Sequence, residues 1–151
     1  MLCYFDSSIV LAILLDESRK SEALDLWNNA SIRISSILLK LETITVLRRT
    51  YENNKSSLKS SWITMKQHEM NEYLNEVNYR ILDESIENII MVKKELSQCR
   101  TLDAIHIATA MELSTVLPAS SFYLYTFDKK MSDLARKGKF ITNSISEENE
   151  M

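Results

Sequence analysis

The sequence predicts an α/β fold with a mainly parallel central sheet. Short apolar or alternating segments, typical of strands, are separated by longer segments with helical periodicity. This alternation is the pattern of strand–helix–strand units in parallel sheets. The chain of 151 residues is long enough for one domain with a substantial core. We therefore expect a single domain over residues 1–143 and a flexible acidic tail over residues 144–151.

The first half of the chain predicts two strands and four helices. The apolar run LCYF predicts a strand over residues 2–5, and Asp6, Ser7 and Ser8 can cap the helix that begins near Ile9. The alternating SIRISS predicts a strand over residues 31–36. ENNKSS indicates a turn at residues 52–57. The other helices are expected at residues 21–28, 37–51 and 58–76.

The second half of the chain continues the alternation. VNYRIL alternates, SFYLYTF is rich in strand formers, and KFITN is a short candidate strand, so strands are expected at residues 77–82, 121–127 and 139–143. Amphipathic segments predict helices at residues 85–97, 101–115 and 130–137, the second of them with Thr101 as a possible cap.

Composition excludes several classes of function. The single glycine rules out the Gly-rich phosphate loops of dinucleotide-binding and P-loop proteins. The net charge of −3 argues against binding nucleic acid by bulk charge, although a local basic patch remains compatible with it. Two cysteines form no C-x-x-C pair, and no signal peptide or membrane-spanning run is evident, so a cytoplasmic protein without membrane contact is expected.

Four acidic residues are candidates for one site. Asp6 and Asp128 follow predicted strands, so they emerge at the same edge if both strands are parallel and central. Glu42 lies near the start of a helix beside apolar residues, and Asp103 lies in the first turn of another helix, where anions are favoured. Taken singly, each residue could be a helix cap, a surface acid or a turn residue.

Together, these carboxylates predict a metal site. Packed carboxylates repel one another, and a hard divalent cation such as Mg²⁺ or Mn²⁺ removes that cost. Such a site can activate water and stabilise the charge of an in-line phosphoryl displacement. With no Gly-rich loop and no nucleophile triad, the sequence suggests metal-assisted phosphodiester hydrolysis.

Four motifs in order along the chain resemble one known family. YFDSSIV, SILLKLE, RTLDAIHIATA and YTFDKKM resemble the motifs of PIN-domain ribonucleases, specifically the VapC-type toxins of bacterial toxin–antitoxin pairs. The resemblance implies a three-layer α/β/α sandwich and a Mg²⁺-dependent endoribonuclease with its catalytic acids at Asp6, Glu42, Asp103 and Asp128. It also implies a homodimer and a cognate antitoxin that blocks the site. Members of this family often cut transfer RNA or ribosomal RNA.

Further residues are candidates for supporting roles. Ser8 and Thr126 could hydrogen-bond the acids, and His106, one turn after Asp103, is expected to support the site without acting as a catalyst. His68 and His106 lack Cys or His partners at zinc-ligand spacing. Basic residues beside the acids could contact RNA phosphates, namely Arg100, Lys129 and Lys130.

Two points stay open at the level of sequence. Trp62, Met65 and Met70 could belong to the core or could line a groove for an antitoxin helix. The function also has two alternatives. One is an α/β phosphatase or phosphoacceptor domain with Asp6 as nucleophile, although Ser8 stands where such enzymes place a second aspartate. The other is a non-catalytic PIN-fold binding module.

Overall fold

The computed structural model describes residues 1–117, 122–138 and 141–142, and within them it has a five-stranded sheet. The order is β3-β2-β1-β4-β5, and every neighbouring pair is parallel. The strands are β1 (Leu2–Phe5), β2 (Ile32–Ser36), β3 (Val77–Arg80), β4 (Phe122–Tyr125) and β5 (Ile141–Thr142). The predicted parallel α/β sheet is thus confirmed. The tail expected at residues 144–151 lies outside the described residues.

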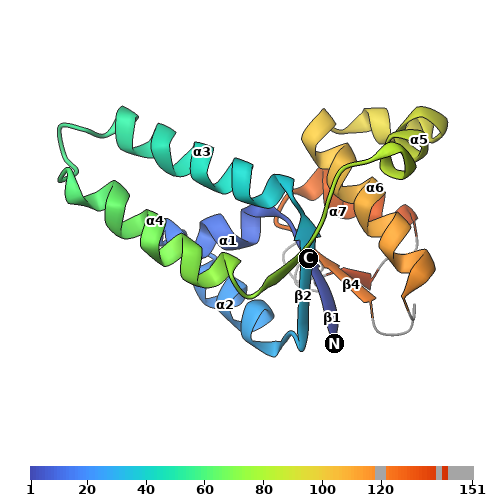
Figure 1. Ribbon diagram of the computed structural model, residues 1–151, viewed down its shortest axis with the longest axis horizontal. Helices are drawn as coiled ribbons and strands as arrows, with labels where there is room; N and C mark the ends of the chain where they lie inside the picture. Colours follow the sequence, from blue (N-terminus) through green and yellow to red (C-terminus); the bar gives the residue numbers. More distant parts are fainter. Residues whose placement is uncertain (118–121, 139–140, 143–151) are drawn as a thin grey trace, which may run out of the picture.

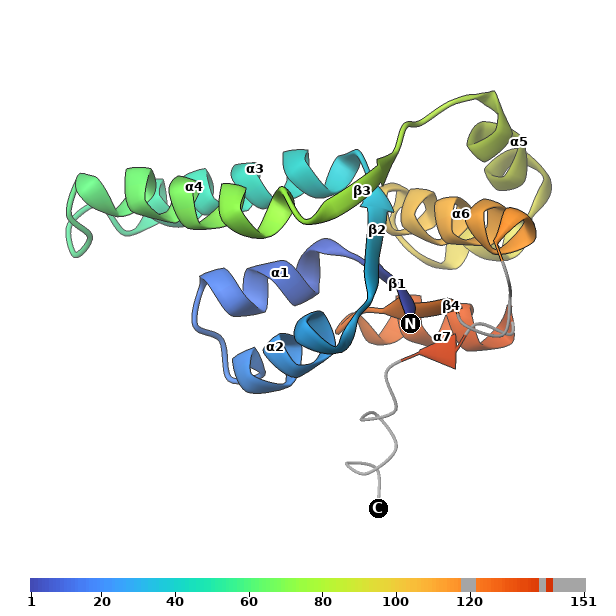
Figure 2. The same ribbon diagram turned by 60° about the horizontal axis from the view of Figure 1, so that its bottom comes forward.

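Helices cover both faces of the sheet and make three layers, as the resemblance implied (Figures 1 and 2). One face packs against four helices, α1 (Ser7–Leu14), α2 (Lys20–Asn29), α3 (Leu38–Asn53) and α4 (Ser61–Leu74). The other face packs against α5 (Glu84–Val92), the 3₁₀ helix η1 (Lys94–Gln98), α6 (Thr101–Val116) and α7 (Lys129–Lys137). No helix among these is long and apolar enough to cross a membrane.

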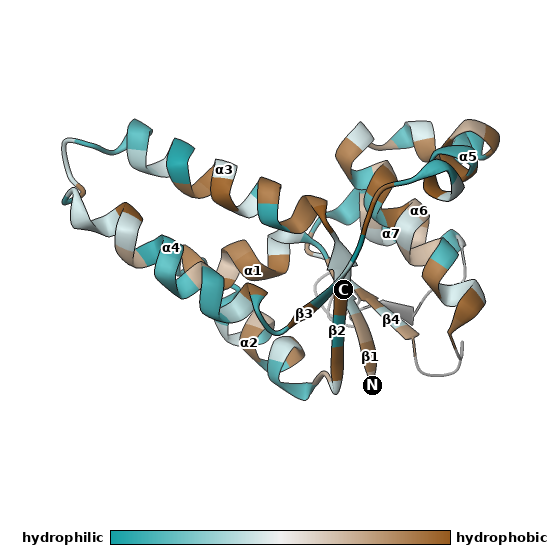
Figure 3. Cartoon of the chain, viewed as in Figure 1, coloured by the Kyte–Doolittle hydropathy of each residue, from teal (hydrophilic) through white to brown (hydrophobic). Residues whose placement is uncertain are grey.

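Strand β1 lies at the centre of the molecule because both of its faces are apolar. Cys3 and Phe5 are fully buried in the core beneath α1 to α4, whereas Tyr4 is fully buried in the core beneath α5 to α7. Alternate side chains of a strand point to opposite faces, so one four-residue segment joins the two cores. Figure 3 shows the same arrangement, with hydrophobic colouring along β1 between the two helical layers.

The single helix expected over residues 85–97 is wrong in its extent, because α5 ends at Val92 and a separate 3₁₀ helix, η1, begins at Lys94. The backbone at Lys93 is extended, with φ −90° and ψ 94°, and separates α5 from η1. Ile86 and Leu96 are both buried in the same core.

Helices α3 and α4 form a long hairpin that extends beyond the sheet (Figure 1). Helix α3 continues through Asn53, into the turn expected at residues 52–57, and Tyr51 stacks on Trp62 of α4 with ring centroids 6.4 Å apart. The structure also shows which of the three residues Trp62, Met65 and Met70 on α4 belong to the core. Met70 is a core residue, Trp62 is partly buried against the same core, and Met65 is 57% exposed.

Candidate active site

The candidate site lies where the strand order reverses. From β1 the chain adds β2 and β3 on one side and later β4 and β5 on the other. The carboxyl ends of β1 and β4 therefore form a switch point, which is where open α/β sheets bind ligands. Asp6 directly follows β1, and its backbone N–H donates to the Tyr125 carbonyl at the end of β4, at 3.3 Å.

Asp6 is held from two sides by hydroxyl and amide donors. It caps helix α1, and its Oδ1 accepts from the Ser8 N–H at 3.1 Å and from the Ser8 hydroxyl at 2.5 Å. Its Oδ2 accepts from the Thr126 hydroxyl at 2.6 Å. A carboxylate offers about four lone-pair positions, so at least one remains for a further partner. Ser8 and Thr126 thus lie where the sequence suggested, in contact with an acid.

The turn after β4 explains where Asp128 lies. The strand expected at residues 121–127 ends at Tyr125, because the next groups turn toward α1. Phe127 N–H donates to the Ser8 hydroxyl at 2.8 Å, and Asp128 N–H donates to the Thr126 hydroxyl at 3.0 Å. Asp128 therefore follows the strand by three residues and caps α7, where its Oδ1 accepts from the Met131 N–H at 2.8 Å.

Glu42 is tied to α1 and α6. Its Oε2 accepts from the Ser7 hydroxyl at 3.3 Å, and its Oε1 lies 2.5 Å from His106 Nε2. His106 is 1% exposed, and its Nδ1 lies 2.7 Å from the Tyr4 hydroxyl. His106 thus bridges the central strand to the acid, which is the supporting position that the sequence suggested for it.

The surroundings of Tyr4 and Glu42 constrain where the protons lie in the bridge that Tyr4, His106 and Glu42 form. The Ser36 N–H donates to the Tyr4 oxygen at 3.1 Å, and burial raises the pKa of the Tyr4 phenol far above its usual value. The Tyr4 hydroxyl therefore keeps its proton, and its oxygen is hydrogen-bonded to His106 Nδ1. Because the Glu42 carboxylate can only accept a hydrogen bond, its short contact with His106 assigns a proton to Nε2, which donates to Glu42 Oε1.

Removal of the Tyr4 hydroxyl should destabilise the fold. Tyr4→Phe leaves the Ser36 N–H and His106 Nδ1 without their buried partner. We expect the free energy of unfolding to fall by about 2 kcal/mol, the usual cost of orphaned buried groups. Urea denaturation measures it. The control is Tyr79→Phe, which removes one half-buried bond to the Leu74 carbonyl and should cost less. Equal losses in both variants would contradict a special role for the bridge.

Asp103 lies in the first turn of α6, near the other acids. The helix begins at Thr101 and its capping position is Arg100, which makes no side-chain cap bond, so the expected Thr101 cap is wrong. Burial raises the pKa of Asp103, and the neighbouring charges of Asp128 and Glu42 raise it further. The charges of Arg100, whose Nε lies 3.6 Å from Asp103 Oδ2, and of His106 oppose this shift without cancelling it.

The pKa of Asp6 is raised for similar reasons. Burial raises the pKa of Asp6 above the usual aspartate value, and the Glu42 charge adds to this, although the charge of His106 and hydrogen bonds from Ser8 and Thr126 act in the opposite direction. The mutual effects connect Asp6 to Glu42, and Asp103 to both Glu42 and Asp128. Each of the four acids, which come from distant parts of the chain, therefore lies close enough to at least one other to interact with its charge.

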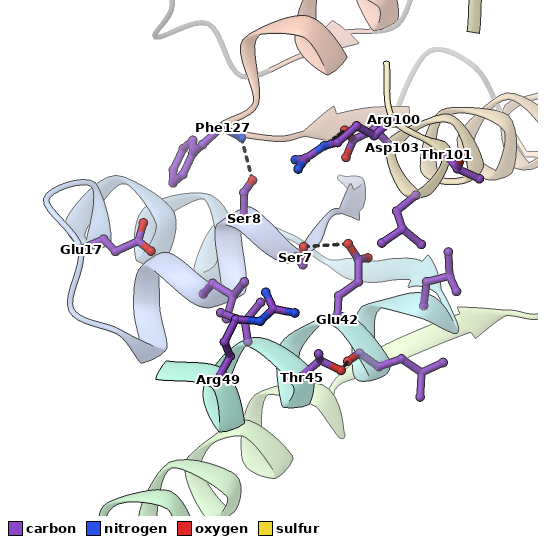
Figure 4. A pocket seen from close by; sticks show the side chains of 15 residues that line it. Ser7, Ser8, Glu17, Glu42, Thr45, Arg49, Arg100, Thr101, Asp103 and Phe127 are labelled. Atoms are coloured by element: carbon purple, nitrogen blue, oxygen red, sulfur yellow. Dashed lines mark hydrogen bonds and ion pairs between the residues drawn. The ribbon is translucent and has the colours of Figure 1, made fainter. Parts of the chain in front are cut away.

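Two clefts flank Asp103. The first, called here the apolar cleft, has a volume of about 660 Å³ and an apolar wall, and Glu42 and Asp103 lie at one end of it (Figure 4). Its apolar wall is formed by Leu11, Leu38, Leu41, Val46 and Phe127. The second, called here the basic cleft, is lined by Arg100, Asp103, Asp128, Lys129 and Lys130 among others. Arg100 and Asp103 line both.

The site offers oxygen ligands suited to a hard cation. Glu42 and Asp128 each have lone pairs beyond those used by their hydrogen bonds. Over the described part of the chain, no three His, Cys, Asp or Glu side chains are arranged so that they would hold a metal by themselves. Mg²⁺ binds proteins through one or two carboxylates and keeps several of its waters, so the donor set fits that ion. His68 lies away from the site and pairs with Glu72 on α4 at 3.2 Å.

The PIN domain family model matches residues 3–137, which include all four acids. The chain belongs to the PIN domain family. PIN domains are generally metal-dependent nucleases, and the three-layer fold described above is that of a PIN domain. No curated protein is similar enough in sequence to count as a relative of the chain.

Sequence reasoning missed several residues that shape this PIN site. Tyr4 and Ser7 contact His106 and Glu42, and Phe127 and Arg49 line the apolar cleft. Tyr4 carried one usable signal, since a tyrosine inside an apolar central strand needs a buried partner for its hydroxyl. Arg49 carried none, because helix periodicity does not show which exposed face meets a cleft.

Proposed function

We propose that this PIN domain is a Mg²⁺-dependent endoribonuclease and the toxin of a toxin–antitoxin pair. The observation that carries the nuclease activity is the grouping of four acids at the switch point between β1 and β4, beside Arg100, Lys129 and Lys130. The toxin role rests on the motif RTLDAIHIATA and its resemblance to VapC-type toxins. Transfer RNA or ribosomal RNA is the proposed substrate class.

Asp6, Glu42, Asp103 and Asp128 would hold Mg²⁺ either directly or through its bound waters, with Mn²⁺ as a substitute. When bound, such an ion activates water and stabilises charge at the phosphate. Neighbouring side chains would hold these carboxylates in position. Ser8 and Thr126 hold the Asp6 carboxylate, and His106 holds Glu42 through its Nε2 proton. Fixed carboxylates avoid the cost of reorganisation during the reaction.

The basic residues around the acids would bind the RNA backbone. Arg100 is largely exposed, and Lys129 and Lys130 are exposed at the start of α7. Phosphate contacts of this kind position an RNA without reading its sequence, and their affinity falls as salt rises. The net charge of −3 over the whole chain keeps this attraction local to the site.

Metal dependence is the first test. Purified protein should cut cellular RNA in Mg²⁺, lose the activity in excess EDTA, and regain it when Mn²⁺ is added. Sequencing of RNA ends after pulse expression would then locate the cuts. Cleavage that persists in EDTA would refute the proposed metal dependence. If no RNA is cut under any of these conditions, the proposed activity is refuted and the non-catalytic binding module is favoured.

The toxin role needs a separate test. We propose that expression of the chain arrests growth, and that a cognate antitoxin encoded beside it relieves the arrest. The oligomeric state, proposed to be a homodimer, is measured separately on the purified protein.

The phosphatase alternative has little support, because Ser8 stands where such enzymes place a second aspartate and its hydroxyl donates to Asp6. Trapping of a phosphoenzyme would revive it.

A further inference from the structure

The apolar cleft has features that the chemistry of the acids does not require. Metal binding and phosphate attack need oxygen ligands and positive charge, yet the wall beside Glu42 contains leucines, a valine and an aromatic ring. Leu41 is 59% exposed, which leaves apolar surface uncovered at the edge of the site. Exposed apolar surface that continues a catalytic site indicates a binding surface for part of the substrate.

Phe127 offers an aromatic ring at this wall. Its backbone N–H is fixed by the Ser8 hydroxyl, and the guanidinium of Arg19 lies 3.7 Å from the ring centroid. Arg19 is itself held by two bonds to Glu22, of 2.8 and 2.7 Å. The ring is thus oriented before any ligand arrives. Figure 4 shows Phe127 and Arg100 on one side of the cleft, with Arg49 and Thr45 on the other.

Arg49 gives the cleft a charge that is available to a ligand. It is exposed on α3, and within the described residues its side chain makes no hydrogen bond or ion pair. Arg100 stands at the other side, at the boundary between the apolar and basic clefts. A ligand with apolar flat faces and a negatively charged backbone would match both the wall and the two arginines.

We propose that the apolar cleft is a nucleobase site for single-stranded RNA. The RNA backbone would follow Lys129, Lys130 and Arg100 to the acids, and the base of the adjacent nucleotide would enter the apolar cleft against Phe127. A base inside a duplex cannot reach such a cleft, whereas unpaired bases stack on aromatic side chains. The volume of about 660 Å³ is within the range of ligand pockets. This proposal rests on the proposed function, because the ligand is a part of the same RNA.

Binding in EDTA tests the site without requiring cleavage. The probes are fluorescein-labelled single-stranded octamers of U, A or C, and an abasic ribose-phosphate octamer with the same charge. Fluorescence anisotropy gives each Kd for the full chain. At least one base-bearing octamer should bind about tenfold tighter than the abasic one, as expected from base–aromatic stacking.

Variants divide the affinity into two parts. Phe127→Leu should remove most of the preference for bases while leaving abasic binding unchanged, and Phe127→Trp should keep the preference. Arg49→Ala should weaken base-bearing and abasic octamers equally and lower the salt dependence. Arg48→Ala is the matched control for it, since Arg48 is the exposed neighbour that does not line the cleft. Met65→Ala is the control for exposed apolar surface elsewhere.

The outcomes separate this proposal from the proposed function. If base-dependent binding requires Phe127 but no RNA is ever cut, the base site stands and the nuclease activity fails. If RNA is cut but base-bearing and abasic octamers bind alike, the base site is refuted, and the apolar wall serves a protein partner instead. A preference for bases that survives Phe127→Leu also refutes it, provided that thermal unfolding shows the variant to be folded.

Discussion

Asp6→Asn should reduce RNA cleavage in Mg²⁺ by at least about 100-fold, because loss of a supporting partner alone costs 10–100-fold in metal sites and Asp6 is a proposed ligand. The substitution keeps the shape of the side chain. It should therefore preserve the bonds from Ser8, which cap α1. Initial rates on cellular RNA, at several Mg²⁺ concentrations, measure the effect, and excess Mg²⁺ should not restore the rate.

The matched control for this substitution is Asp83→Asn. Asp83 caps α5 in the same local geometry, with its Oδ1 accepting from the Ser85 N–H at 3.0 Å, but it lies outside the acidic group. If Asp83→Asn leaves cleavage unchanged while Asp6→Asn abolishes it, the loss comes from the carboxylate in the site and not from a weakened cap. An Asp6→Asn protein as active as the parent would remove Asp6 from the catalytic set.

The sequence could predict the edge of the sheet at which the acids gather, because that inference needs only local patterns. Asp6 follows an apolar run, and in a parallel sheet the residue after a central strand lies at the carboxyl edge. Asp128 was expected directly after its strand, but the turn at Thr126 and Phe127 inserts between them. The geometry of this turn depends on the Ser8 hydroxyl of α1, which accepts from the Phe127 N–H, and no local sequence pattern reveals that contact.

The support of Glu42 could be predicted only in part. His106 was expected to support the site from its place one turn after Asp103, but its partners could not be named. Tyr4 is 102 residues away from it in the chain and Glu42 is 64 residues away, so both contacts depend on the sheet order. The alternation of strands and helices predicts a parallel sheet without predicting that β4 lies beside β1.

Asp103→Asn should stabilise the metal-free protein and abolish its stabilisation by Mg²⁺. Burial and the charges of Asp128 and Glu42 raise the pKa of Asp103 in the folded state above the usual value of 3.8. At Asp103 the folded state therefore binds a proton more strongly than the unfolded state, so the contribution of Asp103 to stability in EDTA falls as pH rises from about 3.8 through the raised pKa. Removing the charge should flatten this dependence and raise the melting temperature at pH 7.

Mg²⁺ should reverse the order of the two melting temperatures, so that the wild-type protein becomes more stable than Asp103→Asn. At a concentration of 100 times its Kd, a ligand stabilises the folded state by about 2.7 kcal/mol, or roughly 5–10 °C for a domain of this size. The wild-type protein should gain this amount and Asp103→Asn should gain little, as measured by thermal unfolding with and without EDTA. Asp133→Asn is the control, because it removes the same charge from an exposed position on α7. If Mg²⁺ stabilised Asp103→Asn as much as the wild type, Asp103 would not be a ligand of the ion.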